Sequence, residues 1–306
     1  MQRSNSLTRF TTFVVIALTL TVVVGCGGKK GGGQSLTAQY EKAMKLGSPD
    51  AKSKQLLKIG EQQAKAGDSG GANKSFIAAG SAAEEITLPR LRAEILSEVA
   101  KAEGQRGKGL RAEEMLKKAR DAYNAIEAVH DRIPAIANCA EVFALHLDSA
   151  AKGKGELLEA EDLIASITEP QLKIQAAGRI AAAYFTINRE KDGVRVLDST
   201  TASAEAIADA RQKADALLQI ASILAEAKQT DKGKEILASA ITAIGTIEDV
   251  QSKAFALTNL AESQLAFGEK TAARASLDEA STLAEKVEAS LRGDLTDRIE
   301  RVKGKI

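Results

Sequence analysis

The sequence predicts an all-α solenoid of about six 40-residue helix–turn–helix repeats that ends in a C-terminal capping helix. The first observation is a small residue, called here the anchor, that recurs at spacings of 40, 40, 41, 40 and 40: Gly60, Ala100, Ala140, Ala181, Ala221 and Ala261. The second is a large apolar residue sixteen positions after each anchor, with one inserted residue in the third copy: Phe76, Leu116, Leu157, Leu197, Leu237 and Leu277. A fixed period of this length is typical of stacked repeats. The third is composition: aromatic residues make up only 3% and Trp is absent, which argues against a β-sandwich or barrel.

Each copy is predicted to begin with a helix A that starts eleven residues before its anchor. Pro49, Pro89 and Pro170 occupy this position. Proline suits the first helical turn, where its missing N–H would have had no intrahelical partner. Residues that favour N-caps stand one position earlier in three copies: Ser48, Asp209 and Asp249.

Helix A is predicted to end seven residues after the anchor, and a helix B follows after a short turn. Four copies place there a residue that tolerates the left-handed backbone conformation closing a helix: Gly67, Gly107, Asn188 and Gly268. The third copy departs from this pattern. Pro134 lies five places further into helix A, and the inserted residue falls in a longer connection from Asp148 to Gly155. We therefore expect helix A of the third copy to be frayed or re-phased.

Both ends of the array carry the features of caps. Leu36 to Leu46 is predicted to be a lone helix B with a polar outer face, since Gln39 stands where five of the six copies have Ala. At the C-terminus, apolar residues recur at helical spacing with charged residues between them: Leu291, Leu295, Ile299 and Val302. A solenoid needs such half-polar ends because its terminal copies have only one neighbour.

Residues 1–25 are predicted to be an export signal. Arg3 and Arg9 form its basic end, and the apolar run from Phe13 to Val24 is too short to span a bilayer, which takes roughly 20 residues. Val23-Val24-Gly25-Cys26 resembles the lipobox of bacterial lipoproteins. The resemblance implies that Cys26 is lipidated and becomes the first residue of the mature chain. An ordinary secretory signal with a cysteine there by chance is the alternative.

Residues 26–35 are predicted to be the lipidated Cys26 followed by a flexible tether. Gly27 to Ser35 is rich in Gly and Lys and has a root-mean-square reach of about 15–18 Å. Gly27 stands where an Asp would resemble an inner-membrane retention signal. The expected location is therefore the outside of a bacterial membrane, and the periplasmic face of the outer membrane if the organism has one.

Residues 36–306 resemble the tetratricopeptide repeat family, and several positions carry the resemblance: the small anchor, the apolar residue before it, the small residue twelve later, the large residue sixteen later and the final Ala. Its repeat is usually shorter than this one. The resemblance implies a right-handed solenoid whose helices A line a surface that binds peptides. Its lining would include eight residues: Lys54, Leu57, Glu61, Leu218, Glu226, Phe255, Thr258 and Glu262.

A cation lies eight residues before every anchor: Lys52, Arg92, Arg132, Lys173, Lys213 and Lys253. One interpretation is a basic ladder that binds an anionic envelope polymer. The other is structural, because Glu169, Asp209 and Asp249 lie four residues earlier in three copies, a spacing that favours pairing along a helix. We favour the structural interpretation, since charged helix faces are usually solvated.

No motif in the sequence points to catalysis, a metal or a cofactor. Cys139 occupies a core column, and His146 lies seven residues further on, about 10.5 Å along a helix, too far for a nucleophile–base pair. The Gly-rich segment from Gly67 to Ser75 follows a helix, whereas a phosphate loop follows a strand. Lys and Arg number 42 against 41 Asp and Glu, which gives no general attraction to nucleic acid.

The sequence therefore predicts a non-catalytic scaffold, anchored to a bacterial membrane by a lipid on Cys26, that binds a protein or peptide through its helices A. The alternative is a module that binds an anionic polymer along the basic ladder. An enzyme is the third and least favoured class, because none of the usual catalytic constellations is present.

Overall fold

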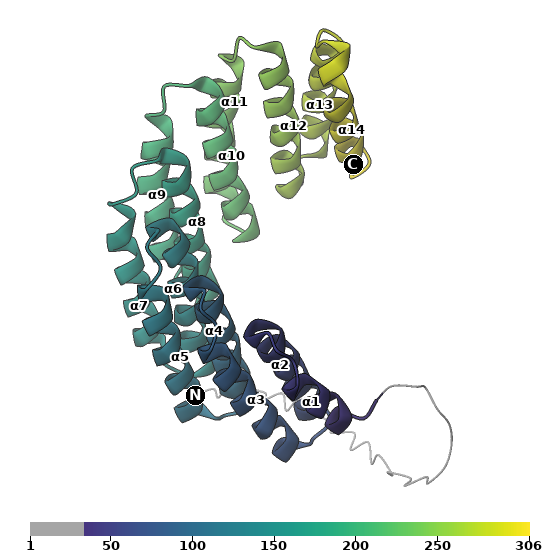
Figure 1. Ribbon diagram of the computed structural model, residues 1–306. Helices are drawn as coiled ribbons and strands as arrows, with labels where there is room; N and C mark the ends of the chain where they lie inside the picture. Colours follow the sequence, from purple (N-terminus) through teal and green to yellow (C-terminus); the bar gives the residue numbers. More distant parts are fainter. Residues whose placement is uncertain (1–33) are drawn as a thin grey trace, which may run out of the picture. The chain divides into compact units, whose positions relative to one another are not determined.

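Helices A and B alternate along the chain, as the computed structural model shows for residues 34–306 (Figure 1). The six helices A are α2 (Pro49–Lys65), α4 (Pro89–Gln105), α6 (Val129–His146), α8 (Pro170–Thr186), α10 (Ala210–Glu226) and α12 (Val250–Ala266). The six helices B are α3 (Ser69–Glu84), α5 (Gly109–Asn124), α7 (Ala150–Ile164), α9 (Glu190–Glu205), α11 (Thr230–Gly245) and α13 (Lys270–Ala284). The predicted signal, Cys26 and the tether up to residue 33 lie outside the described residues.

The predicted repeat is confirmed, because the helices A begin at residues 49, 89, 129, 170, 210 and 250. Within the described part of the chain there are fourteen helices and no strand, so the fold is an all-α solenoid of helical hairpins. Pro49, Pro89 and Pro170 each lie in the first turn of a helix A. Asp209 and Asp249 cap their helices as predicted, accepting hydrogen bonds from the backbone N–H of Gln212 and Ser252. Ser48 makes no side-chain cap; its hydroxyl bonds Asp50 instead.

Each of the six helices A is followed by a residue with a positive φ angle, whereas the sequence predicts such a residue in only four copies. The four predicted stops are confirmed, with φ of 80°, 71°, 59° and 75° at Gly67, Gly107, Asn188 and Gly268. The other two are Asp148 at 49° and Lys228 at 59°. The stops in the third and fifth copies were therefore missed, and at Lys228 the stacking of the copies imposes this turn although lysine does not favour it.

The third copy is neither frayed nor re-phased, so that prediction is wrong. α6 begins at Val129, in register with the other helices A, and continues through Pro134. The proline removes only the bond that its N–H would donate to the carbonyl of His130, which lies in the first turn. The inserted residue lengthens α6 to 18 residues where the other helices A have 17, and the connection to α7 stays as short as its counterparts.

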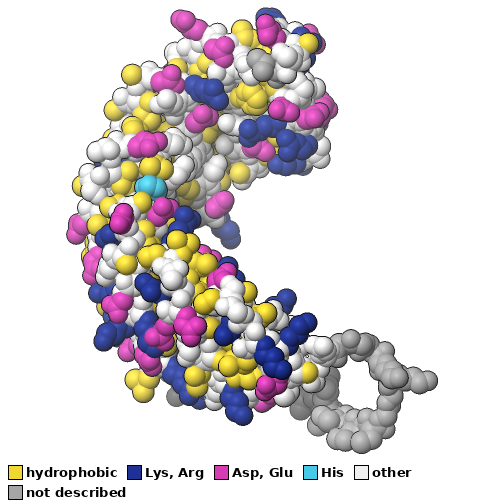
Figure 2. Space-filling view, viewed as in Figure 1, with side chains coloured by type: hydrophobic (Ala, Val, Ile, Leu, Met, Phe, Trp, Pro, Cys, Tyr) yellow, Lys and Arg dark blue, Asp and Glu magenta, His cyan; other side chains and the backbone are white. Residues whose placement is uncertain are grey.

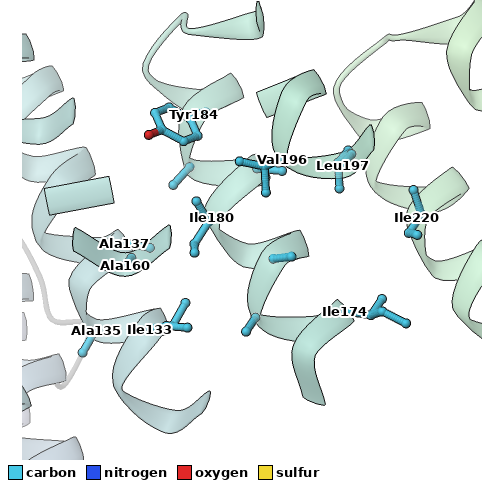
Figure 3. Close-up of a cluster of buried hydrophobic side chains, with 14 of the residues drawn as sticks. Ile133, Ala135, Ala137, Ala160, Ile174, Ile180, Tyr184, Val196, Leu197 and Ile220 are labelled. Atoms are coloured by element: carbon cyan, nitrogen blue, oxygen red, sulfur yellow. The ribbon is translucent and has the colours of Figure 1, made fainter. Parts of the chain in front are cut away.

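The core is a continuous cluster of buried apolar side chains from Ala43 to Val302, and Figure 3 shows the part that runs from α6 to α10. Matched sizes hold helices A and B together within a copy. At the first anchor, an added Cβ on Gly60 would lie 2.7 Å from ring atom Cε1 of Phe76. The second copy has Ala100 and Leu116 in the same two columns, both fully buried.

The two layers of helices are joined to their neighbours in different ways. Each helix A packs directly against the helices A of the adjoining copies. Successive helices B from α3 onward are joined mainly by ion pairs across the gap between them, such as Lys118–Glu84 at 2.7 Å and Lys232–Asp198 at 2.9 Å. The tighter layer is therefore formed by helices A; three hollows open between helices B, and one lies between the helices A α2 and α4.

Both predicted caps are present. α1 (Leu36–Met44) packs on α2 and α3, and Gln55 and Gln62 are exposed on α2 at positions that are buried in most other copies. α14 (Ala289–Lys303) packs on α12 and α13 and buries Leu295, Ile299 and Val302. Between residues 34 and 306, no helix combines the length and apolar character needed to cross a membrane.

Candidate binding surfaces

The eight residues proposed to line the helix A surface divide into exposed and buried positions. Lys54, Glu61 and Glu226 are exposed, and Phe255 and Glu262 are half-buried. Of the other three, Leu218 and Thr258 were placed wrongly, because they are only 4% and 0% exposed. Leu57 is 7% exposed, but it lines a hollow between α2 and α4 together with Lys54 and Glu61. All three lie three residues before an anchor, where the helix A of the next copy packs.

The column two residues before the anchor reaches the surface instead: Lys58, Glu98, Asn138, Arg179, Gln219 and Asn259. The position three residues before the anchor is packed tightly against the next helix A. At this position in the fourth copy, an added Cβ on Gly178 would lie 2.5 Å from Ile223 of α10. We define the A face by four positions in each helix A: six residues before the anchor, two residues before it, one residue after it and five residues after it. These spacings form one stripe along a helix. Its uniformly polar second column is the signal that the prediction overlooked.

The A face of α6 to α12 is partly closed by bonds between neighbouring helices A. Arg179 of α8 donates to Glu141 at 2.8 Å and to Asn138 at 2.7 Å on α6. Asn259 of α12 donates to Asp215 of α10 at 3.3 Å. These bonds fix side chains of the A face without covering them.

Individual positions on this part of the A face differ in chemistry. Leu145 is 45% exposed, and Glu226 occupies the same column two copies later. Phe255 packs against the edge of the core. Burial alone would raise the pKa of Glu262, but hydrogen bonds from Lys305 and Arg298 hold it below its usual value. The surface is thus mixed, with apolar and charged groups close together.

The A face of α2 and α4 is more open and more basic. A hollow of about 410 Å³ lies between these helices, and Lys54, Lys58, Glu61, Glu98 and Lys101 line it. Within the described residues, none of its three lysines takes part in an ion pair. Burial, and next the charge of nearby Glu94, raise the pKa of Glu98. This hollow therefore carries charges that the fold itself does not use.

The predicted basic ladder has a local explanation at two of its six positions. Arg132 donates to the carbonyl of Ile126 at 3.1 and 2.6 Å, and Lys253 donates to that of Gly245 at 3.4 Å. Both carbonyls lie where the preceding helix B ends, and a cation is favourable at the negative end of a helix dipole. All six side chains are half-exposed. Polymer binding along the row stays a prediction.

The proposed pairing of ladder lysines with acidic residues four positions earlier is not what the fold uses. In residues 34–306, none of the three pairs lies within ion-pair distance, and Asp209 and Asp249 serve as N-caps instead. A local structural role is therefore shown for Arg132 and Lys253 only, and with partners other than those that the sequence suggested.

Three hollows between successive helices B were not predicted. Phe76 and Leu116 of the recurring apolar column line two of them, but most of the charged lining residues differ from copy to copy. The three hollows lie between α3 and α5, α5 and α7, and α7 and α9. The hollow between α5 and α7, about 440 Å³, has Leu116 and Phe143 in its floor and Lys152 paired with Glu113 on its rim. Its charged groups, apart from Lys117, pair with one another: Arg120 with Glu156 and Glu159, and Lys152 with Glu113.

Helix α7 is attached on both sides by a Tyr–Glu–Arg network. Glu156, only 5% exposed, accepts hydrogen bonds from Tyr123 at 2.7 Å and Arg120 at 2.5 Å. Five residues later, Glu161 accepts from Tyr184 at 2.6 Å and from Arg195 at 2.7 and 2.8 Å. Burial, followed by the hydrogen bond to its glutamate, raises the pKa of each tyrosine. These networks are structural.

Cys139 is a core residue, as predicted. It is 1% exposed, and burial raises the pKa of its thiol, which keeps it protonated and unreactive. Across residues 34–306, no group of three His, Cys, Asp or Glu side chains is arranged to hold a metal ion.

No protein-family model matches the chain, and a search of curated proteins gives no match. Among solved structures, the chain is similar to Ton1535 from Thermococcus onnurineus NA1, with 16% identity, coverage of 86% of this chain and 83% of that one, and a TM-score of 0.29. It is also similar to a Rap protein solved in complex with competence and sporulation factor, with 15% identity, coverage of 88% and 79%, and a TM-score of 0.32. Values this low leave function to be argued from the chain's own residues, which form a helical-repeat protein.

Proposed function

We propose that this protein is a non-catalytic interaction scaffold, held at a bacterial membrane by a lipid on Cys26, and that its A face from α6 to α12 binds a protein or peptide partner. Residues 27–35 would give the solenoid its reach from the membrane. The repeated columns form the core, so specificity belongs to the columns that vary.

The observation that carries the proposal is the character of the A face. The anchor and core columns repeat, whereas the exposed columns change from apolar Leu145 to cationic Arg179 and acidic Glu226. Interfaces gain specificity from this kind of mixture, with apolar groups beside fixed polar ones. The bonds from Arg179 and Asn259 hold part of this surface in place before a partner binds, which lowers the entropic cost of binding.

The binding surface is tested by changing two residues of the A face and, separately, two exposed residues outside it. Leu145→Glu combined with Glu226→Lys alters the A face. The matched control is Leu158→Glu combined with Glu279→Lys. Leu158 lies on α7 and is 43% exposed, which is close to the 45% exposure of Leu145. Crosslinked pull-downs from envelope fractions should lose a specific partner with the first variant only. Equal recovery with both variants would place the partner elsewhere.

The proposed attachment to the membrane is tested by measuring the mass of the mature N-terminus. A lipid on Cys26 should be present in the wild type and absent from Cys26→Ser, which should appear in the soluble fraction. A mature chain without lipid that fractionates as soluble would establish the ordinary secretory signal instead.

A further inference from the structure

Charge is unevenly divided along the chain. Residues 26–85 contain nine Lys and Arg against six Asp and Glu, whereas residues 86–306 contain 31 against 35. Two of the nine, Lys29 and Lys30, belong to the tether, and residues 36–85 alone contain seven Lys against six Asp and Glu. The tether and the first helices together are therefore net positive and the remainder net negative, although the whole chain is nearly neutral. Such an asymmetry points to different surroundings for the two parts.

The lysines at this end take no part in holding the fold together. Within the described residues, none of the seven that precede residue 86 lies in an ion pair: Lys42, Lys45, Lys52, Lys54, Lys58, Lys65 and Lys74. After residue 85, by contrast, 16 of the 31 cations are paired, as the ion pairs of the described chain show.

Half of the acidic residues at this end are already engaged elsewhere. Asp68 accepts a hydrogen bond from the N–H of Gly71 and caps α3, Glu84 pairs with Lys118 of α5, and Asp50 accepts from Ser48. Of these three, Glu84 is balanced by Lys118, whereas Asp50 and Asp68 keep their charge because their donors are neutral. The lysines therefore leave this end with a small net positive charge.

Several of the lysines share one surface. Lys54, Lys58 and Lys65 are exposed on one stripe of α2, and Lys101 faces them across the hollow on α4. Lys42 and Lys45, at the end of α1, are exposed as well. These six lysines are called here the basic end. In Figure 2, dark blue side chains gather over α1 and α2.

We infer that the basic end docks on the anionic headgroups of a lipid bilayer. A lysine ammonium on a flexible stem suits a diffuse layer of negative charge better than a fixed geometry. Each lysine near such a surface increases partitioning by about fivefold. α1 begins only ten residues after Cys26, so the docking surface is the part of the solenoid nearest in sequence to the proposed lipid. The net negative remainder is repelled from the same surface.

The test uses residues 26–306 with Cys26→Ser, since Leu36–Ile306 form a compact unit and the variant carries no lipid. Cosedimentation with phosphatidylcholine vesicles, with and without phosphatidylglycerol, measures docking. Binding should require phosphatidylglycerol and weaken as salt is added. Lys54→Gln, Lys58→Gln and Lys65→Gln together should lower partitioning at least about tenfold.

The matched control is Lys117→Gln, Lys191→Gln and Lys286→Gln, which neutralises three exposed lysines outside the basic end. It should bind as the parent does, and circular dichroism should show all variants folded. Equal loss in both triple variants, or binding without phosphatidylglycerol, would overturn the inference. So would capture of an acidic protein by the basic end with no vesicle binding. None of these results bears on the Leu145 and Glu226 variants, so the two proposals fail separately.

Discussion

The match between Gly60 and Phe76 predicts that two harmful substitutions should rescue each other. An alanine at residue 60 would place its Cβ 2.7, 2.9 and 3.0 Å from three ring atoms of Phe76, against about 3.5–4.0 Å for ordinary contact. Overpacking of this kind costs about 1–3 kcal/mol, and the better helix propensity of alanine returns about 1 kcal/mol. We expect Gly60→Ala to destabilise the first copy by about 1 kcal/mol.

Phe76→Leu alone should also destabilise this copy, by about 1–2 kcal/mol, because a buried ring is replaced by a smaller side chain. The double variant recreates the pairing of Ala100 with Leu116 in the second copy. It should therefore be nearly as stable as the wild type, although the single losses add to about 2–3 kcal/mol. The expected coupling energy is at least about 1.5 kcal/mol in favour of the pair.

Hydrogen exchange of amides in α2 and α3 is the suitable assay. Copies of a solenoid are stabilised mainly by their neighbours, so damage at one end can unfold that end alone and escape a global measurement. Exchange should accelerate in each single variant and return toward the wild-type rate in the double variant. Additive losses would refute the reasoning that these two columns are matched by size.

Three other predictions concern the turns, the attachment of α7 and pH. Lys228→Gly should raise the free energy of unfolding by about 0.5–1 kcal/mol in urea titrations, because lysine is strained at φ 59°, whereas Gly268→Ala should lower it; changes of the same sign would contradict this. Tyr123→Phe removes a hydrogen bond to buried Glu156 and should cost about 1–2 kcal/mol by chemical denaturation; no loss would mean that Arg120 alone suffices. Burial lowers the pKa of His146 below 6.5, and NMR titration should measure this lowered pKa. The neutral imidazole therefore contributes to stability. This contribution is complete above pH 6.5 and should be lost as the pH falls through the lowered pKa. An NMR value at or above 6.5 would exclude that contribution.

Much of the fold could be predicted because the same packing residues recur at the same spacing in six copies. The anchors, the prolines and the final helix each follow from one local requirement, and the structure agrees with them. The third copy could not be predicted in the same way. A proline and an inserted residue favour disorder locally, but the neighbouring copies hold α6 in register and the extra residue is accommodated at its end. For the same reason Lys228 adopts a conformation that its own preference opposes.

The binding surface was predicted less well, since it depends on how closely neighbouring copies approach. One sequence position separates Leu218, which is buried, from Gln219, which faces outward, and helical periodicity within one copy does not decide between them. The networks of Glu156 and Glu161 join residues about 20 to 40 positions apart without recurring, and the charged side chains that line the hollows between helices B differ from copy to copy. Sequence period carries no signal for such contacts.

Site-specific photocrosslinking in living cells tests the central claim most directly. A photoreactive amino acid at residue 145, in place of Leu145 on the A face, should yield one discrete crosslinked partner in the wild-type background. The same group in place of Leu158 should yield none, and Cys26→Ser should reduce the product by removing the protein from the membrane. A product at Leu158 with none at Leu145, or a product unchanged by Cys26→Ser, would contradict a membrane-anchored scaffold that binds through its A face.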